Sequence, residues 1–141
     1  MPWTLGRDVP TLLDDSFPLP LTRPFTTAQA AAAGVGRNVL RRLEQLGLVR
    51  RLLRGVYVAA QAPDNLLLRA QAVALMVPED GVVTDWTACW LHAGVLPPGG
   101  HLEVPPVSVF LPPGAGRLRN GLCSSGERTV TPDDLMLIHG V

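Results

Sequence analysis

Hydrophobic and polar residues recur with helical spacing between Arg37 and Leu46. At about 100° per residue, the apolar side chains gather on one face of such a helix. They are Val39, Leu40, Leu43 and Leu46. The opposite face carries only polar and cationic side chains: Arg37, Asn38, Arg41, Arg42 and Gln45. The pattern predicts an amphipathic helix with Val39, Leu43 and Leu46 buried and Arg41 exposed.

A shorter helix is predicted immediately upstream. Thr26 and Gln29 have the spacing of a capping box, in which hydroxyl and amide each accept a backbone N–H that the helix leaves unpaired. The alanine-rich run 27–33 favours helix, and Gly34 is a suitable residue to end it. Residues 35–36 then form a short turn before the amphipathic helix. Two helices joined in this way are typical of a helix-turn-helix.

A β-hairpin is predicted after the second helix. The runs 48–53 and 56–59 are rich in β-prone residues, and they flank Arg54-Gly55. Gly55 can adopt the positive φ that a tight hairpin turn needs. A hairpin at this place would form the wing of a winged helix-turn-helix over residues 21–60. Arg50, Arg51 and Arg54 would then lie on or beside the wing.

Charge is distributed unevenly along the 141 residues, although the formal net charge is zero. All twelve basic residues are arginine, and six of them lie between Gly34 and Val58, where Glu44 is the only acid. The rest of the chain is acidic on balance. A solvated helix face would normally mix charges of both signs. A basic module joined to an acidic one therefore favours nucleic-acid binding by the first module over a merely solvated surface.

The basic module carries the side chains that duplex DNA recognition uses. Arginine can contact guanine in the major groove with two hydrogen bonds, and asparagine or glutamine can do the same with adenine. Arginines on a wing are placed to contact phosphates or to enter the minor groove. The predicted DNA-binding residues are therefore Arg37, Asn38, Arg41, Arg42, Gln45, Arg50, Arg51 and Arg54.

The flanking segments complete an α+β prediction. Residues 1–20 contain four prolines and are expected to form an extended arm. Residues 61–141 are expected to form a small α+β domain. Asp64 is expected to cap a helix running to Val77, whose inward-facing residues would be Leu66, Leu67, Ala70, Val73, Ala74 and Val77. Thr84 is expected to cap a second helix ended by Gly94, with a core stripe of Trp86, Cys89, Trp90 and Ala93.

Two strands are predicted further on. The first spans residues 102–111, where Pro105-Pro106 would confine part of it to a sheet edge. The second spans residues 135–138, and its return strand would begin at Val141. A strand without a return partner leaves backbone donors unpaired. We therefore expect the second domain to be incomplete in this chain.

The sequence points away from catalysis, metals and cofactors. Asp133-Asp134 are adjacent, so on an extended chain they face opposite ways and form a poor catalytic pair. Cys89 and Cys123 form no CxxC pair and are expected to be free and buried. The glycine-rich stretches lack the lysine and hydroxyl residue of a phosphate-binding loop. With no signal peptide and no membrane-length apolar run, a cytoplasmic protein is expected.

The string FTTAQAAAAGVGRNVLRRLEQLGLVRRLLRGVYV resembles the N-terminal winged helix of the AbiE-type antitoxins, a family common in actinobacteria. The match is best over residues 24–59 and ends on the wing string RGVYV. The resemblance implies a double-stranded DNA operator as ligand and autorepression of a toxin–antitoxin operon. It also implies a nucleotidyltransferase-like toxin as a protein partner.

A second function class stays open at this point. Similar winged-helix starts also precede restriction-endonuclease-like domains. The chain could therefore be the DNA-binding part of such a protein, with the catalytic domain missing. A third possibility, a module that binds only protein, would require the arginine face to be covered.

Overall fold

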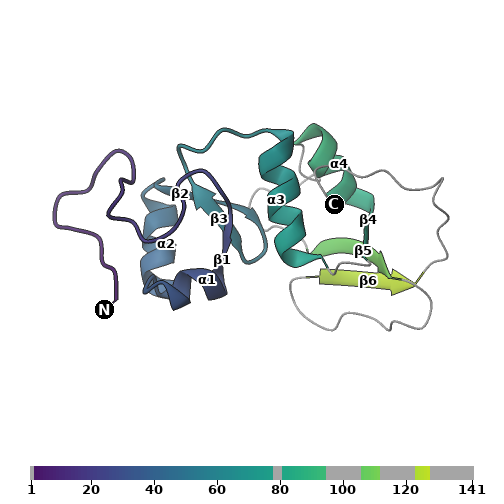
Figure 1. Cartoon of the computed structure of the whole chain (residues 1–141), viewed down its shortest axis with the longest axis horizontal. Helices are drawn as coiled ribbons and strands as arrows, with labels where there is room; N and C mark the ends of the chain where they lie inside the picture. Colours follow the sequence, from purple (N-terminus) through teal and green to yellow (C-terminus); the bar gives the residue numbers. More distant parts are fainter. Residues whose placement is uncertain (1, 78–80, 95–105, 112–122, 128–141) are drawn as a thin grey trace. The chain divides into compact units, whose positions relative to one another are not determined.

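The computed structural model describes residues 2–77, 81–94, 106–111 and 123–127. The chain divides into two compact units, Met1–Pro63 and Asp64–Val141. Both units combine helices with strands, so the predicted α+β class is confirmed (Figure 1). The strand predicted over residues 135–138 lies outside the described residues.

The first unit has a winged-helix architecture. Its elements in chain order are β1 (Phe25–Thr26), α1 (Thr27–Ala32), α2 (Arg37–Gln45), β2 (Val49–Leu53) and β3 (Val56–Ala59). The strands form an antiparallel sheet in the order β1-β3-β2. Helix, turn, helix and hairpin therefore follow one another as the sequence predicts. The two-residue strand β1 was not predicted, because its pairing with β3 joins residues about thirty positions apart.

The core of the first unit collects apolar side chains from both helices, the sheet and the N-terminal segment. Leu40 and Leu43 are the buried residues of α2, and Phe25 is 1% exposed. Leu43 is buried as predicted, whereas Val39 and Leu46, which were also predicted to be buried, pack against this core but are only partly buried. They lie at the margins of the apolar face, where the surface of the helix turns away from the core.

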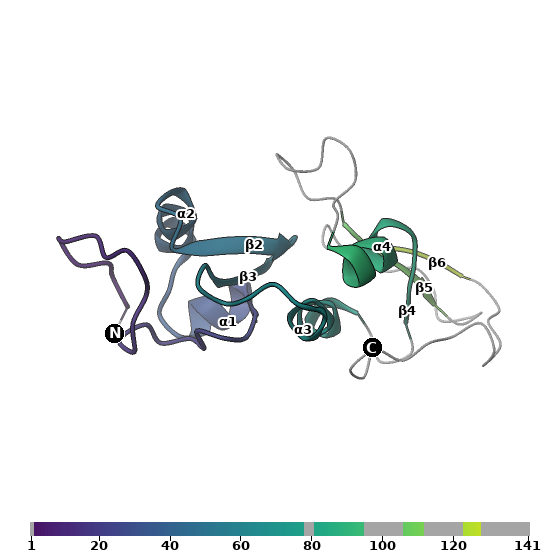
Figure 2. The same cartoon turned by 90° about the horizontal axis from the view of Figure 1, so that it is seen from above.

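The N-terminal segment, purple in Figures 1 and 2, has no helix or strand between residues 2 and 24. It nevertheless packs on the first unit. Leu13 and Phe17 are buried in its core, and the Trp3 backbone N–H donates to the Gly34 carbonyl at 2.8 Å. The Gln61 side chain holds the same segment by donating to the Leu13 carbonyl at 2.8 Å. The arm is therefore part of the folded unit.

The second unit contains α3 (Leu66–Met76), β4 (Val82–Val83), α4 (Asp85–Ala93), β5 (Val107–Leu111) and β6 (Cys123–Glu127). Its described strands form a sheet in the order β4-β5-β6, in which β5 pairs antiparallel with β4 and parallel with β6. Strand β5 is the described part of the strand predicted over residues 102–111. It begins only after Pro106 and lies between two other strands, so the expected edge position does not apply to this part.

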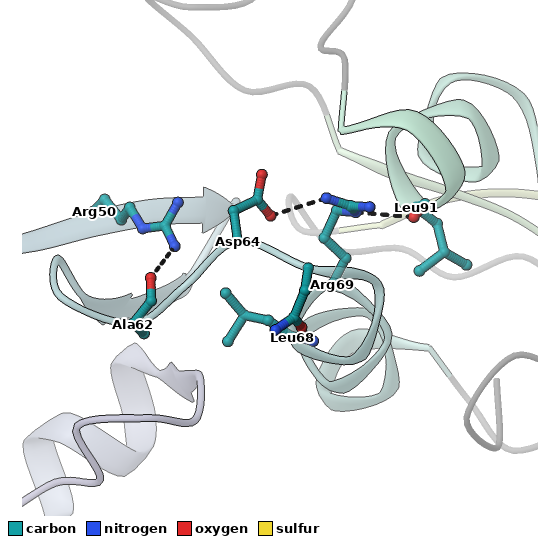
Figure 3. Close-up of polar contacts among 7 residues, drawn as sticks. Arg50, Ala62, Asp64, Leu68, Arg69 and Leu91 are labelled. Carbon is teal, nitrogen blue, oxygen red and sulfur yellow. Dashed lines mark hydrogen bonds and ion pairs between the residues drawn. The ribbon is translucent and has the colours of Figure 1, made fainter.

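The helix starts of the second unit differ in detail from the predictions. Asn65, and not Asp64, caps α3 by accepting from the Leu68 N–H at 2.8 Å. Asp64 instead pairs with Arg69 at 3.0 Å, and Arg69 Nε also donates to the Leu91 carbonyl at 2.9 Å (Figure 3). Thr84 precedes α4 as expected, but its side chain makes no capping hydrogen bond. The Asp64 carboxylate is thus used to hold Arg69 rather than to cap a helix.

The buried faces of α3 and α4 are also shifted from the predicted ones. In α3 the buried residues are Leu68, Ala70, Ala72 and Val73, and in α4 they are Thr87, Trp90 and Leu91. The predicted core positions that are exposed instead, and therefore wrong, are Leu67, Ala74, Cys89 and Ala93. Thr87 tolerates burial because its hydroxyl accepts from the Ser108 N–H at 2.9 Å.

Candidate nucleic-acid interface

The outer face of α2 presents five polar side chains together. The predicted base-reading residues are all exposed: Arg37, Asn38, Arg41, Arg42 and Gln45. Leu40 and Leu43 anchor the opposite side of the helix in the core. A helix held in this way offers a row of hydrogen-bond donors of a width that fits a major groove.

The start of α2 is determined by α1 and by the turn that joins the two helices. At the start of α1, the Thr26 hydroxyl accepts from the Gln29 N–H at 3.0 Å, and the Gln29 amide oxygen accepts from the Thr26 N–H at 2.9 Å. The predicted capping box is confirmed. Gly34 has a φ of 93°, and Val35 is buried and donates to the Ala30 carbonyl at 2.8 Å. This turn fixes where α2 begins.

The wing is a short hairpin whose two strands differ in what they expose. Gly55 has a φ of 73° and closes the turn between β2 and β3, as the sequence predicts. Arg51 lies opposite Tyr57 across the hairpin and is exposed. Arg54 lies at the turn and is half-buried. The ladder is irregular between Arg51 and Leu53, so the end of the wing departs from a regular hairpin.

Arg50 takes a different position from its neighbour. Successive residues of a strand face opposite sides of the sheet, so Arg50 and Arg51 diverge. The Arg50 Nη2 donates to the Ala62 carbonyl at 2.7 Å, and its Nε is buried without a partner among the described residues (Figure 3). This guanidinium holds the segment that leaves the wing. Arg50 is therefore a weaker candidate for DNA contact than Arg51.

Two residues of the surface between α2 and the wing were not among the predicted site residues. Glu44 of α2 lies 3.8 Å from Arg51, measured from Oε1 to Nη2. Tyr57 of β3 is half-buried and stacks on Phe25, with ring centroids 6.5 Å apart. A regular hairpin around Arg54-Gly55 would place Leu52 opposite Tyr57. Only the register shift between Arg51 and Leu53 brings Arg51 there, so the predicted hairpin contained no signal for Tyr57.

The pKa of Tyr57 is affected by charged residues of both α2 and the wing. Burial raises its pKa, and the Glu44 carboxylate raises it further, because both disfavour the phenolate. Arg51 and Arg41 act in the opposite direction and lower the pKa. The phenol therefore lies within electrostatic reach of α2 and of the wing.

The described residues suggest no other chemistry. Within them, no group of three histidine, cysteine or acidic side chains could hold a metal ion. Across the same residues, no helix is both long and apolar enough to cross a membrane. Asp133 and Asp134, which we interpreted from the sequence as a poor catalytic pair, lie outside the described part of the chain.

A helix-turn-helix followed by a β-hairpin, with arginine on the second helix and the wing, defines the class of winged helix-turn-helix proteins. The comparison with known families agrees with this class. Residues 22–60 match the family described as "Transcriptional regulator, AbiEi antitoxin". The matched segment coincides with β1, the two helices and the wing, and it confirms the resemblance drawn from the sequence. No curated protein matches the chain.

Proposed function

We propose that this protein is a sequence-specific DNA-binding antitoxin that represses its own toxin–antitoxin operon. In this proposal α2 enters the major groove of the operator, and the wing contacts the phosphate backbone. The two proposed partners are the operator DNA and the toxin encoded by the same operon. Because both are cytoplasmic, we propose that the protein acts in the cytoplasm. The family match favours a regulator over the DNA-binding part of a restriction-endonuclease-like protein.

The observation that carries the proposal is the exposed face of α2. Its five outward side chains are arginine, asparagine or glutamine, and none is acidic. Arginine forms a planar fork that suits guanine edges and phosphates equally well. In this proposal the exposed arginines Arg41 and Arg42 of α2 contact base edges.

The test is equilibrium binding of the full chain to DNA from the region upstream of its own gene. A scrambled duplex of equal length and composition is the matched control. We expect tighter binding to the native duplex and a marked decrease in affinity as salt rises, because phosphate contacts release counterions. Equal affinity for both duplexes would contradict sequence-specific binding, and no binding to either would contradict the proposal as a whole.

The antitoxin part of the proposal involves a protein partner, expected to be a nucleotidyltransferase-like toxin. The residues from 64 onward contain eight acids and four arginines, so their charge differs from that of the DNA-binding module. The test is co-expression with the neighbouring gene of the operon. Rescue of growth and co-purification of the two proteins support the antitoxin assignment, and toxicity unchanged by this chain contradicts it.

A further inference from the structure

Glu44 is the only acid between Gly34 and Val58, and along the sequence it lies between the arginines of α2 and those of the wing. It belongs to α2, one turn beyond Arg41 on the same side of the helix. On its other side it faces Arg51 of β2, and each of the two side chains is 35% exposed. An acid at this place is unexpected, because a DNA backbone that spans α2 and the wing would pass close to it.

The contact between Glu44 and Arg51 is loose. Their nearest nitrogen and oxygen are 3.8 Å apart, which is too long for a hydrogen bond. It is therefore a contact between charges at a partly exposed site, and such pairs are weak and easily screened by salt. A phosphate that offers shorter, charge-assisted hydrogen bonds can displace the carboxylate from the guanidinium.

The charges of Glu44, Arg51 and Arg41 all act on the pKa of one neighbour, Tyr57. After burial, Glu44 is the main cause that raises this pKa, whereas Arg51 and Arg41 lower it. Tyr57 lies opposite Arg51 in the hairpin and is held in place by its ring contact with Phe25. It is therefore within electrostatic reach of both the proposed base-reading helix and the proposed backbone-contacting wing.

We propose that Glu44 is an internal competitor of the DNA backbone, which holds Arg51 in the unbound protein and must release it to a phosphate when DNA binds. This inference rests on the proposed function. Release leaves the Glu44 carboxylate without its partner and close to phosphate of the same sign. Glu44 therefore weakens every complex that relies on the wing, whatever the DNA sequence, and limits non-specific binding.

The exchange has a specific consequence for the salt dependence. In the wild type, Arg51 displaces a counterion from DNA, but the abandoned carboxylate attracts a cation from solution. The Glu44→Gln variant has no carboxylate at this position, so no cation is taken up there when DNA binds. The variant should take up fewer cations on binding, so its salt slope should be steeper, by less than the value of about 0.9 that one complete phosphate contact contributes.

The experiment measures binding of the full chain and of Glu44→Gln to the native upstream duplex and to the scrambled duplex, over a salt series. Asp15→Asn is the matched control, because it removes one exposed negative charge from the N-terminal segment of the same unit. We expect Glu44→Gln to bind both duplexes several-fold more tightly at low salt, with the gain shrinking as salt rises. Asp15→Asn should change the affinity much less.

A double-mutant cycle with Arg51→Gln tests the exchange itself. If Glu44 occupies Arg51 in the unbound protein, Arg51→Gln should cost more affinity in the Glu44→Gln background than in the wild type. Equal costs in the two backgrounds overturn the exchange. A lower affinity of Glu44→Gln than of wild type also overturns it, because Glu44 would then position Arg51 for binding.

A measurement without DNA separates this inference from the proposed function. Tyr57 is the only tyrosine of the chain, so the ultraviolet absorbance of phenolate reports on it alone. Its pKa should fall in Glu44→Gln and stay unchanged in Asp15→Asn. If wild type binds no duplex, the proposed function fails. If wild type binds while Glu44→Gln matches Asp15→Asn in affinity and in Tyr57 titration, only the present inference fails.

Discussion

The rings of Trp3 and Phe17 meet edge to face, with centroids 5.1 Å apart and planes at 80°. Phe17 also contacts Phe25, which in turn stacks on Tyr57 of the wing. A chain of aromatic contacts thus runs from the N-terminal segment to β3. Edge-to-face pairs of this kind stabilise a fold beyond the apolar area that they bury. The segment before the family match therefore contributes to the stability of the winged helix.

The first prediction concerns Phe17, which is 4% exposed. Phe17→Ala should lower the free energy of unfolding of the first unit by about 3–5 kcal/mol, because it removes a buried ring and leaves a cavity. Leu12→Ala is the matched control, since Leu12 lies in the same segment and is 54% exposed. Urea unfolding, with hydrogen exchange of α2 to assign the change to this unit, measures both. Equal effects of the two substitutions would contradict a structural role for the segment.

The second prediction separates the adjacent residues Arg50 and Arg51. Arg50→Ala should destabilise the first unit by about 1–3 kcal/mol, because the Ala62 carbonyl is deprived of a charge-assisted hydrogen bond. Arg51→Ala should cost about 1 kcal/mol or less, because its ion pair is partly exposed. Thermal unfolding of the two variants beside the wild type gives the comparison. If Arg51→Ala proves the more damaging to stability, the assigned roles are reversed.

The features that the sequence predicted correctly depend on local patterns. The helical period of α2, the capping box at Thr26 and Gln29, and the glycine at the wing turn all concern residues within a few positions of one another. The exposed polar face of α2 follows from the same period. Such features are determined before any distant part of the chain is considered.

The features that were missed depend on distant partners. Strand β1 exists because Phe25 pairs with Tyr57. The direction taken by Arg50 depends on the Ala62 carbonyl, and the burial of Thr87 depends on the backbone N–H of Ser108. The hydrogen bond between Thr87 and Ser108 is not visible in a pattern of apolar residues. The pattern therefore did not place the polar residue Thr87 in the core. Periodicity alone therefore misplaced the buried face of α4.

The third prediction is a pH dependence. The pKa of Tyr57 is raised in the folded protein, chiefly by burial and then by Glu44. The folded state therefore holds this proton more tightly than the unfolded state. Its contribution to stability is complete below the ordinary tyrosine pKa of about 10 and is lost as the pH rises through the higher folded-state value. The chain has no lysine, so few other groups titrate in this range.

Tyr57→Phe keeps the ring against Phe25 and removes the titrating hydroxyl. Its stability should match the wild type near neutral pH and should fall less between neutral and strongly alkaline pH. Urea unfolding of both proteins over a pH series measures the difference. Parallel pH profiles would show that Tyr57 titrates alike in the folded and unfolded states.

The fourth prediction concerns the second unit. The residues from 64 onward carry eight acids against four arginines, which should repel DNA. A full-length variant with Arg41, Arg42, Arg51 and Arg54 all changed to alanine should therefore no longer bind any duplex at moderate salt. Circular dichroism confirms that the variant is folded. Substantial residual binding would locate a second DNA-binding surface outside the winged helix.

The last prediction distinguishes the two groups of arginines within the proposed interface. Arg41→Ala or Arg42→Ala should cost about 1–3 kcal/mol on the native upstream duplex and reduce the preference over the scrambled one, because contacts to base edges carry sequence information. Arg51→Ala or Arg54→Ala should weaken both duplexes alike. The salt slope should fall by about 0.9 if Arg54→Ala removes one phosphate contact, and by less in Arg51→Ala, because cation uptake at Glu44 offsets part of the counterion release by Arg51. Fluorescence anisotropy over a salt series measures both quantities. If all four substitutions leave affinity unchanged, the arginines form only a solvated surface, and DNA binding by this winged helix is ruled out.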